Sequence, residues 1–185
     1  MSLSQVGQAG QTGQTDRYRG DWRNDTRHGY GEAEYANGDR FKGCFRYGKR
    51  AGNGTCWFAT GDVYDGAWFD DKPQGQGKIT YANGDVFEGM FENGCRADGE
   101  GRLIFSTGQV YTGNFVNDMP QGQGICEFIN GDVYSGNWVD GVMCGEGEMT
   151  FSSGAVYRGS FADGKRDGIG TMEDPISGDV YEGEW

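Results

Sequence analysis

The sequence predicts an all-β fold, an elongated, twisted antiparallel β-meander of about fifteen strands with no central globular core. First, a motif of aromatic, spacer, glycine, spacer and aromatic recurs every 23 or 24 residues, and such a period is typical of repeat arrays. Second, apolar and polar residues alternate within each copy, as they do along a strand. Third, 36 of the 185 residues are glycine and only 3 are proline, which favours frequent turns. Repeat units contact mainly their neighbours, so each copy is expected to form one β-hairpin stacked on the next.

The first ring of the motif marks eight copies along the chain. It is found at Tyr18, Phe41, Tyr64, Phe87, Tyr111, Tyr134, Tyr157 and Tyr181. Residues 16–185 are therefore predicted to form an array of seven full repeats and a truncated eighth, as in a piece cut from a longer array. Residues 1–15 lack the period and are rich in Gln, Gly, Ser and Thr, which predicts a disordered tail or a cloning remnant.

The copy at residues 62–84 illustrates the first strand. Residues 62–68 alternate so that Tyr64, Gly66 and Trp68 share one face. A glycine between two large rings leaves room for a ring to lie over the backbone. The sequence therefore predicts a strand with an aromatic face.

The remainder of this copy supplies a turn, a second strand and another turn. Residues 69–73 predict a polar turn, where other copies carry a glycine that accepts positive φ. Residues 75–81 predict the second strand, with Ile79 and Tyr81 on the aromatic face. Residues 82–85 contain Asn-Gly and predict a tight closing turn.

The seventh copy departs from the pattern. Its segment 171–178 is one residue longer, and Asp174 stands where the other copies carry a ring. An extra residue at the end of a strand predicts a bulge or a distorted turn.

Composition argues against several classes of function. The longest apolar runs fall well short of the roughly 18 residues of a spanning helix. The single histidine belongs to no Ser/His/Asp set, which argues against a catalytic triad. None of the G-x-G pairs precedes Gly-Lys-Ser/Thr, which argues against a phosphate-binding loop. Five cysteines at no paired spacing, without a secretion signal, favour a reducing compartment. We therefore expect no enzyme activity, no cofactor, no metal, and a cytoplasmic location.

Charge is distributed unevenly. Residues 1–50 carry nine Arg or Lys against six Asp or Glu, whereas residues 51–185 carry seven against twenty-two. The basic residues of the first segment are Arg17, Arg19, Arg23, Arg27, Arg40, Lys42, Arg46, Lys49 and Arg50. Two interpretations stay open, either solvated strand faces and turns or a contact with an anionic lipid head group or an acidic partner. The acidic remainder argues against non-specific binding to membranes or nucleic acid.

These motifs resemble the MORN repeat (membrane occupation and recognition nexus). The resemblance rests on Y-x-G-x-W/F, a turn, G-x-G, an aromatic and N-G-D, and it covers residues 17–185. Its departures are the longer seventh copy and Phe in place of Trp at Phe45, Phe91, Phe115 and Phe161. The resemblance implies an extended twisted single sheet and a non-enzymatic scaffold of cytoskeletal or membrane-associated assemblies. It also implies that array ends can dimerise and that phospholipid binding is an alternative activity.

The aromatic face supports two interpretations, packing between repeats and a groove for protein partners. The residues predicted to form the partner-binding face are Tyr64, Trp68, Tyr81, Phe87, Phe91, Tyr111, Phe115, Tyr134 and Trp138. We expect a scaffold in the cytoskeleton or peripheral to a membrane. The alternatives are a phosphoinositide-binding module that uses the basic N-terminal repeats, and a targeting array normally attached to an enzyme.

The C-terminal repeats are predicted to form a homodimer. An edge strand exposes unpaired backbone groups, and no lysine protects this one. The predicted dimer end consists of Tyr157, Phe161, Tyr181 and Trp185. A twofold contact between two such ends is the simplest arrangement.

Overall fold

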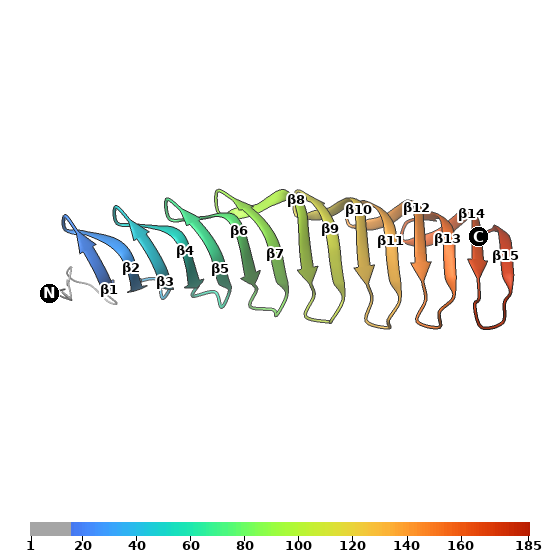
Figure 1. Ribbon diagram of the computed structural model, residues 1–185, viewed down its shortest axis with the longest axis horizontal. Helices are drawn as coiled ribbons and strands as arrows, with labels where there is room; N and C mark the ends of the chain where they lie inside the picture. Colours follow the sequence, from blue (N-terminus) through green and yellow to red (C-terminus); the bar gives the residue numbers. More distant parts are fainter. Residues whose placement is uncertain (1–15) are drawn as a thin grey trace. The chain divides into compact units, whose positions relative to one another are not determined.

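The computed structural model describes residues 16–185, and the predicted tail at residues 1–15 lies outside the described residues. Within this range the regular structure consists of fifteen β-strands, and no helix long and apolar enough to span a membrane is found there. The chain divides into two compact units, Met1–Arg96 and Ala97–Trp185. In each unit the hairpins stand side by side in sequence order (Figure 1).

In the first unit every strand from β1 to β6 pairs antiparallel with the strand that follows it. The strands are β1 (Arg17–Arg23), β2 (Thr26–Glu34), β3 (Arg40–Arg46), β4 (Lys49–Trp57), β5 (Val63–Phe69), β6 (Lys72–Thr80) and β7 (Val86–Glu92). In register, Gly66 of β5 faces Gly54 of β4 and Gly77 of β6. The glycines of neighbouring hairpins therefore line up across the sheet.

The second unit repeats this arrangement. Its strands are β8 (Cys95–Ile104, which begins just before the unit), β9 (Val110–Val116), β10 (Met119–Glu127), β11 (Val133–Val139), β12 (Val142–Thr150), β13 (Val156–Ala162), β14 (Lys165–Glu173) and β15 (Val180–Glu184). Each strand from β8 to β14 pairs antiparallel with the strand that follows it. The predicted all-β meander of hairpins is confirmed.

The hairpin turn is shorter than predicted. Asp70 and Asp71 both have positive φ, 50° and 68°, so they form a two-residue turn of the kind whose twist matches the flanking strands. Residues 69–73 were expected to be a turn, but Lys72 and Pro73 belong to β6, and Pro73 faces Trp68. The prediction was wrong because a proline was taken as a turn residue, whereas here it stands next to the first residue of a strand.

The closing turn is longer than an Asn-Gly pair predicts. Gly84 has φ 90°, and its N–H donates to the carbonyl of Tyr81 at 2.9 Å. The N–H of Tyr81 donates in turn to the carbonyl of Asp85 at 2.8 Å. These bonds enclose a three-residue loop in which only the glycine requires positive φ, so the tight two-residue turn lies at the opposite end of the hairpin.

The seventh closing turn is distorted, as predicted. The N–H of Asp174 donates to the carbonyl of Asp179 at 2.9 Å, one residue further along than in the other copies. Oδ1 of Asp174 accepts the N–H of Ile176 at 2.8 Å. The carboxylate therefore satisfies a backbone donor that the extra residue leaves without a partner on the strand.

An aspartate joins successive closing turns. Oδ1 of Asp62 accepts the N–H of Ala82, in the next copy, at 2.8 Å. The same 2.8 Å bond joins Asp16 to Ala36, Asp39 to Ala59, and Asp132 to Ser152. A charge-assisted hydrogen bond thus fixes each of these loops to its neighbour.

The core is a ladder of rings held close to the backbone. Tyr64 is fully buried, and its hydroxyl donates to the carbonyl of Ala67 at 2.9 Å. The ring crosses the glycines of its own hairpin, so a Cβ at Gly77 would lie 2.6 Å from Cε2 of Tyr64. Residue 77 must therefore be glycine for the Tyr64 ring to occupy its observed position.

The ladder continues from hairpin to hairpin. In the first unit Trp68 packs edge-to-face on Phe41, and Phe91 packs in the same way on Tyr64, with centroids 5.2 and 4.9 Å apart. The corresponding pairs of the second unit are Tyr111 with Trp138, Tyr134 with Phe161, and Tyr157 with Trp185. Nε1 of Trp68 also donates to the carbonyl of Gly54 at 2.8 Å. Rings and hydrogen bonds together join neighbouring repeats.

Candidate functional site

Eight of the nine rings predicted to contact a partner lie inside this ladder. Their side chains are between 0 and 6% exposed, namely Tyr64, Trp68, Phe87, Phe91, Tyr111, Phe115, Tyr134 and Trp138. This burial agrees with the packing interpretation of the rings. The ninth, Tyr81, is half-buried and belongs to a different column of the sheet.

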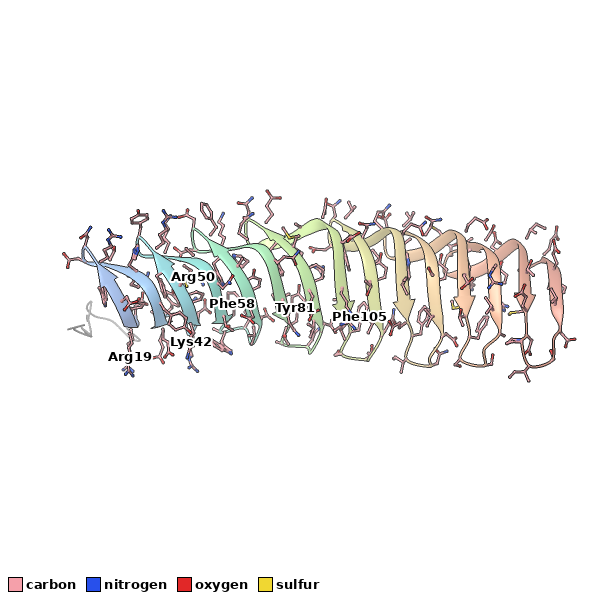
Figure 2. The ribbon with its side chains drawn as sticks, viewed as in Figure 1. Arg19, Lys42, Arg50, Phe58, Tyr81 and Phe105 are labelled. Carbon is pink, nitrogen blue, oxygen red and sulfur yellow. The ribbon has the colours of Figure 1, made fainter. Side chains whose placement is uncertain are left out.

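The half-buried rings form their own column, one ring immediately before each closing turn. In the first unit they are Tyr35, Phe58 and Tyr81, and in the second Phe105, Phe128 and Phe151. Ile79 faces the buried Tyr64, so Tyr81, two residues later, lies on the same face. Figure 2 labels Phe58, Tyr81 and Phe105. The alternation of the sequence places these rings on the ladder face but does not reveal that each of the six keeps part of its surface exposed.

A cleft lies beside Phe151, the last ring of this column in the second unit. It has a volume of about 400 Å³ and lies between Phe151, Met149, Arg166 and Trp185. The guanidinium of Arg166 is 4.1 Å from the centre of the Trp185 ring and 5.8 Å from that of Phe151. The cleft therefore combines apolar walls with a cation stacked on a ring.

In the first unit arginine covers part of the same face. The guanidinium of Arg50 lies 4.3 Å from the centre of the Trp68 ring and 5.6 Å from that of Tyr35. Its Nη2 donates to the carbonyl of Asp71 at 2.8 Å, and its Nε lies 3.3 Å from the carboxylate. Arg27 similarly stacks on Phe45 at 5.2 Å. These two arginines, both predicted to contact lipid, are held by contacts within the sheet.

The other predicted lipid contacts lie elsewhere. Arg19 and Lys42 both face Glu32, on the opposite side of the sheet from Arg50, and Lys42 bonds Glu32 at 2.7 Å. Figure 2 labels Arg19 and Lys42 well apart from Arg50. Arg17 and Arg40 share the side of Arg19, whereas Arg23, Arg46 and Lys49 lie at the hairpin-turn ends of their strands. The nine residues are therefore divided among three surfaces.

The four residues of the predicted dimer end differ in exposure. Tyr157 and Phe161 are buried in the ladder, whereas Tyr181 on β15 is 51% exposed. Trp185 is half-buried and packs on Tyr157 and Tyr181 with centroids 5.0 and 5.2 Å apart. Tyr181 is thus the one member that presents much of its ring.

Burial makes the titratable groups of the ladder face unreactive. Burial raises the pKa of Tyr64, Tyr111 and Tyr134 to about 12 and that of the Cys56 thiol to about 11. These groups stay protonated at neutral pH, so Cys56 supplies no thiolate nucleophile. Among residues 16–185 no three His, Cys, Asp or Glu side chains are grouped so that they could hold a metal ion. The chemistry offered by this face is apolar, aromatic and guanidinium contact.

The family model of the MORN repeat matches six segments of the sequence, residues 18–40, 41–63, 64–86, 111–133, 134–156 and 157–178. The chain belongs to the MORN-repeat family. The resemblance drawn from the motifs is thereby confirmed. Residues 87–110 are not matched, although this segment carries the motif rings Phe87 and Phe91 of a MORN copy.

Two solved structures resemble this MORN array. One is the SAS-4 (dCPAP) TCP domain of Drosophila melanogaster in complex with a proline-rich motif of Ana2 (dSTIL), with 17% identity, TM-score 0.52 and 85% of each chain covered. The other is the TCP10 domain of Danio rerio CPAP in complex with a peptide of Danio rerio STIL, with 12% identity, TM-score 0.39, and 92% of this chain and 90% of that chain covered. The first likeness shows a shared fold. No curated protein matches the sequence.

Proposed function

We propose that this MORN-repeat chain is a non-enzymatic scaffold of a cytoskeletal assembly that binds an extended, proline-containing segment of a partner protein. The observation that carries the proposal is the column of half-buried rings on the ladder face of each unit, Tyr35, Phe58 and Tyr81 in the first and Phe105, Phe128 and Phe151 in the second. The buried ladder beneath them provides a rigid support. We therefore propose that the partner contacts the half-buried rings and not the buried rings that the sequence had indicated.

The spacing of the rings suits such a ligand. Phe58 and Tyr81 follow β4 and β6, which are two strands apart, and strands lie about 4.8 Å apart, so successive rings recur about every 10 Å. A polyproline II helix has three residues per turn at about 3.1 Å each, which makes a turn of about 9 Å. A segment that crosses the strands would thus present one proline to each ring. Aromatic grooves commonly bind this conformation because it is already ordered before binding.

The similarity in fold gives further support. The SAS-4 TCP domain, whose fold resembles this chain, was solved with a proline-rich motif. The proline-rich motif is a ligand of the SAS-4 TCP domain. We propose a similar ligand for this chain because its half-buried ring column is aromatic. The groove of about 400 Å³ beside Phe151 is of a size that side chains of a peptide can enter.

The test is a titration with a labelled synthetic peptide that carries proline at every third position. We expect Phe58→Ala with Tyr81→Ala, and separately Phe128→Ala with Phe151→Ala, to weaken binding by about tenfold each. A peptide with alanine in place of proline should bind more weakly to the wild type. Tyr30→Ala is the matched control, because Tyr30 faces Cys44 on the opposite side of the sheet and is exposed. Equal affinity for the wild type and both double variants would refute the proposal.

The proposal includes self-association through the C-terminal repeats. Tyr181 supports it, since about half of this ring is exposed on β15, which pairs with β14. We expect Tyr181→Ala to lower the average mass measured by light scattering at a fixed concentration. A mass unchanged from wild type would count against this contact.

Phospholipid binding by the basic N-terminal repeats has less support, because the nine basic residues are divided among three surfaces. The surface with Arg19 and Lys42 also carries Glu32, which partly cancels their charge. Flotation with phosphoinositide vesicles tests this alternative. Loss of vesicle binding in Arg19→Ala with Lys42→Ala would favour lipid, and an absence of binding by the wild type would exclude it.

A further inference from the structure

A second cleft lies at the hairpin-turn end of the first unit, away from the half-buried ring column. It has a volume of about 590 Å³ and lies between the β3–β4 hairpin and the β5–β6 hairpin. Its walls include Tyr47 from one hairpin and Phe69 from the next, and the buried Trp68 also lines it. Arg46 and Lys49 line the cleft on the side of the first hairpin, together with Ala51 and Gly52, and Asp70 lines it on the side of the second.

Tyr47 is the exception among the hairpin turns. The first turn residue is Asn or Asp in the six other copies, Asn24, Asp70, Asn93, Asn117, Asp140 and Asp163. Tyr47 adopts the same left-handed conformation with φ 53°, where a bulky side chain is disfavoured and a short polar one is tolerated. Its ring is 71% exposed, so burial does not offset this backbone cost. An edge-to-face contact with His28, with ring centroids 5.8 Å apart, offsets this cost only in part. Local stability alone therefore does not explain the tyrosine.

Phe69 is a second exception, at the last position of β5. The equivalent residues of the other full copies are Arg23, Arg46, Glu92, Val116, Val139 and Ala162. Phe69 is the only ring among them, and it is 69% exposed. Two exposed rings at the edge of one cleft, each absent from the equivalent position of the other copies, indicate a contact surface.

The charge of the cleft identifies the chemistry of its ligand. The guanidinium of Arg46 stacks over Tyr47 at 5.4 Å and has no carboxylate partner among the described ion pairs. Lys49 pairs with Asp70, and both side chains are about half exposed. The cleft therefore keeps a net positive charge in a chain whose formal net charge is −12. Carboxylates of a ligand would complement this positive charge, and an apolar side chain of the ligand would pack on the rings of Tyr47 and Phe69.

We propose that this cleft binds an acidic linear segment of a partner protein, with an aromatic side chain between Tyr47 and Phe69 and carboxylates on Arg46 and Lys49. The site is independent of the proposed groove for proline-containing segments, because it uses the hairpin-turn edge and none of the half-buried rings. A partner could occupy both surfaces of the first unit at once.

The probe is a short labelled peptide of Asp and Glu with one central Trp, and its comparison peptides carry Lys for the acids or Ala for the Trp. The test variant combines Tyr47→Asn with Phe69→Val. Both substitutions introduce residues that the array already uses at these positions, so the fold should be retained, which thermal melting by circular dichroism verifies. Val139→Ala is the matched control, at the position equivalent to Phe69 in the second unit.

We expect the wild type and Val139→Ala to bind the acidic Trp peptide equally, and the double variant to bind it about tenfold more weakly. Both comparison peptides should bind at least about tenfold more weakly than the probe. Equal binding by the double variant, or no binding of the probe to the wild type, overturns the proposal. Two other results would also overturn the proposal if the probe does not bind the wild type. If the wild type binds phosphatidylserine vesicles and the double variant does not, the cleft contacts a membrane. If the wild type self-associates in sedimentation equilibrium and the double variant does not, the cleft binds a second copy of this chain.

Discussion

Trp68 and Phe41 lie in successive hairpins and pack edge-to-face, with ring centroids 5.2 Å apart and planes at 79°. The indole N–H of Trp68 meanwhile donates to the carbonyl of Gly54, a glycine of the preceding copy. One side chain therefore supplies both an apolar and a polar connection between repeats. These side-chain contacts add to the backbone pairing of β4 with β5, which also joins the two hairpins.

Replacing Trp68 by Phe tests this joint. Phe already occupies the equivalent position in Phe45 and Phe91, so the ring should fit, but the 2.8 Å hydrogen bond is lost and the stack with Arg50 at 4.3 Å is weakened. We expect Trp68→Phe to lower the free energy of unfolding by about 2 kcal/mol. Trp138→Phe, which loses a 3.3 Å bond, should cost about 1 kcal/mol. Urea denaturation compares the two, and a greater loss at Trp138 would contradict this account.

Gly77→Ala tests the approach of ring to backbone. The new Cβ would lie 2.6 Å from Cε2 of Tyr64, so we expect a loss of about 3 kcal/mol in the free energy of unfolding. A double-mutant cycle with Tyr64→Leu separates this clash from backbone entropy. If the ring is the cause, Gly77→Ala should cost much less in the Tyr64→Leu background. Additive effects would show that the ring is not responsible.

Asp62→Ala tests the bond between closing turns. It removes the acceptor for the Ala82 N–H at 2.8 Å, and we expect a loss of about 1 to 2 kcal/mol in the free energy of unfolding. Thr60→Ala is the control, since Thr60 donates to the other oxygen of Asp62 within the same turn. The control should cost less than about 0.5 kcal/mol, as surface substitutions usually do. Chemical denaturation of both variants measures the difference.

Tyr47→Asn should raise stability. It replaces a bulky residue at φ 53° with the residue type found at this position in other copies. We expect a gain of about 1 kcal/mol in the free energy of unfolding, because Asn tolerates the left-handed region better. A thermal melt measures it, with Asn93→Tyr as the reverse exchange in the same unit. If Tyr47→Asn lowers the melting temperature, the ring of Tyr47 must contribute more packing than its exposure indicates.

Alkaline pH should unfold the protein through its buried tyrosines. Burial raises the pKa of Tyr64, Tyr111 and Tyr134 to about 12, whereas an unfolded tyrosine titrates near about 10. Below about pH 10 both states keep these protons, and between about pH 10 and 12 only the folded state does, so stability falls as pH rises. The slope should be on the order of 1 kcal/mol per pH unit for each tyrosine. Urea midpoints against pH measure it, and Tyr64→Phe should flatten the curve.

The sequence predicted the hairpins well because the period, the glycines and the alternation all depend on local residue type. It did not predict how completely rings such as Tyr64 are buried. For Tyr64, part of this burial comes from a ring of the adjacent copy, Phe91, with centroids 4.9 Å apart. The two-residue turn could have been read from Asp70-Asp71, since Asp tolerates positive φ, but Pro73 obscured it.

The candidate sites were harder to predict than the fold. Basic residues that are neighbours in sequence separate in space, because strand alternation sends Arg50 to one face and Lys42 to the other. The proposed contact uses Phe58 rather than Trp68 because Phe58 is half-buried and Trp68 is buried, and exposure depends on packing between copies. Tyr47 could have been found from the sequence alone, by aligning the copies and noting the one turn that lacks Asn or Asp.

The loop-to-loop bond from Asp62 to Ala82 joins one copy to the next with the same pair of groups used at Asp132 and Ser152. These aspartate junctions are built alike, so a gene could gain or lose one whole copy at one of them without a new kind of contact, whereas Gln109 and Ala155 replace the aspartate in two other copies. A deletion of part of a copy would instead remove an acceptor or a ring from its partner. Length variation among descendants of this gene should therefore occur in steps of a complete hairpin, while each surviving copy remains free to diversify at its exposed turn.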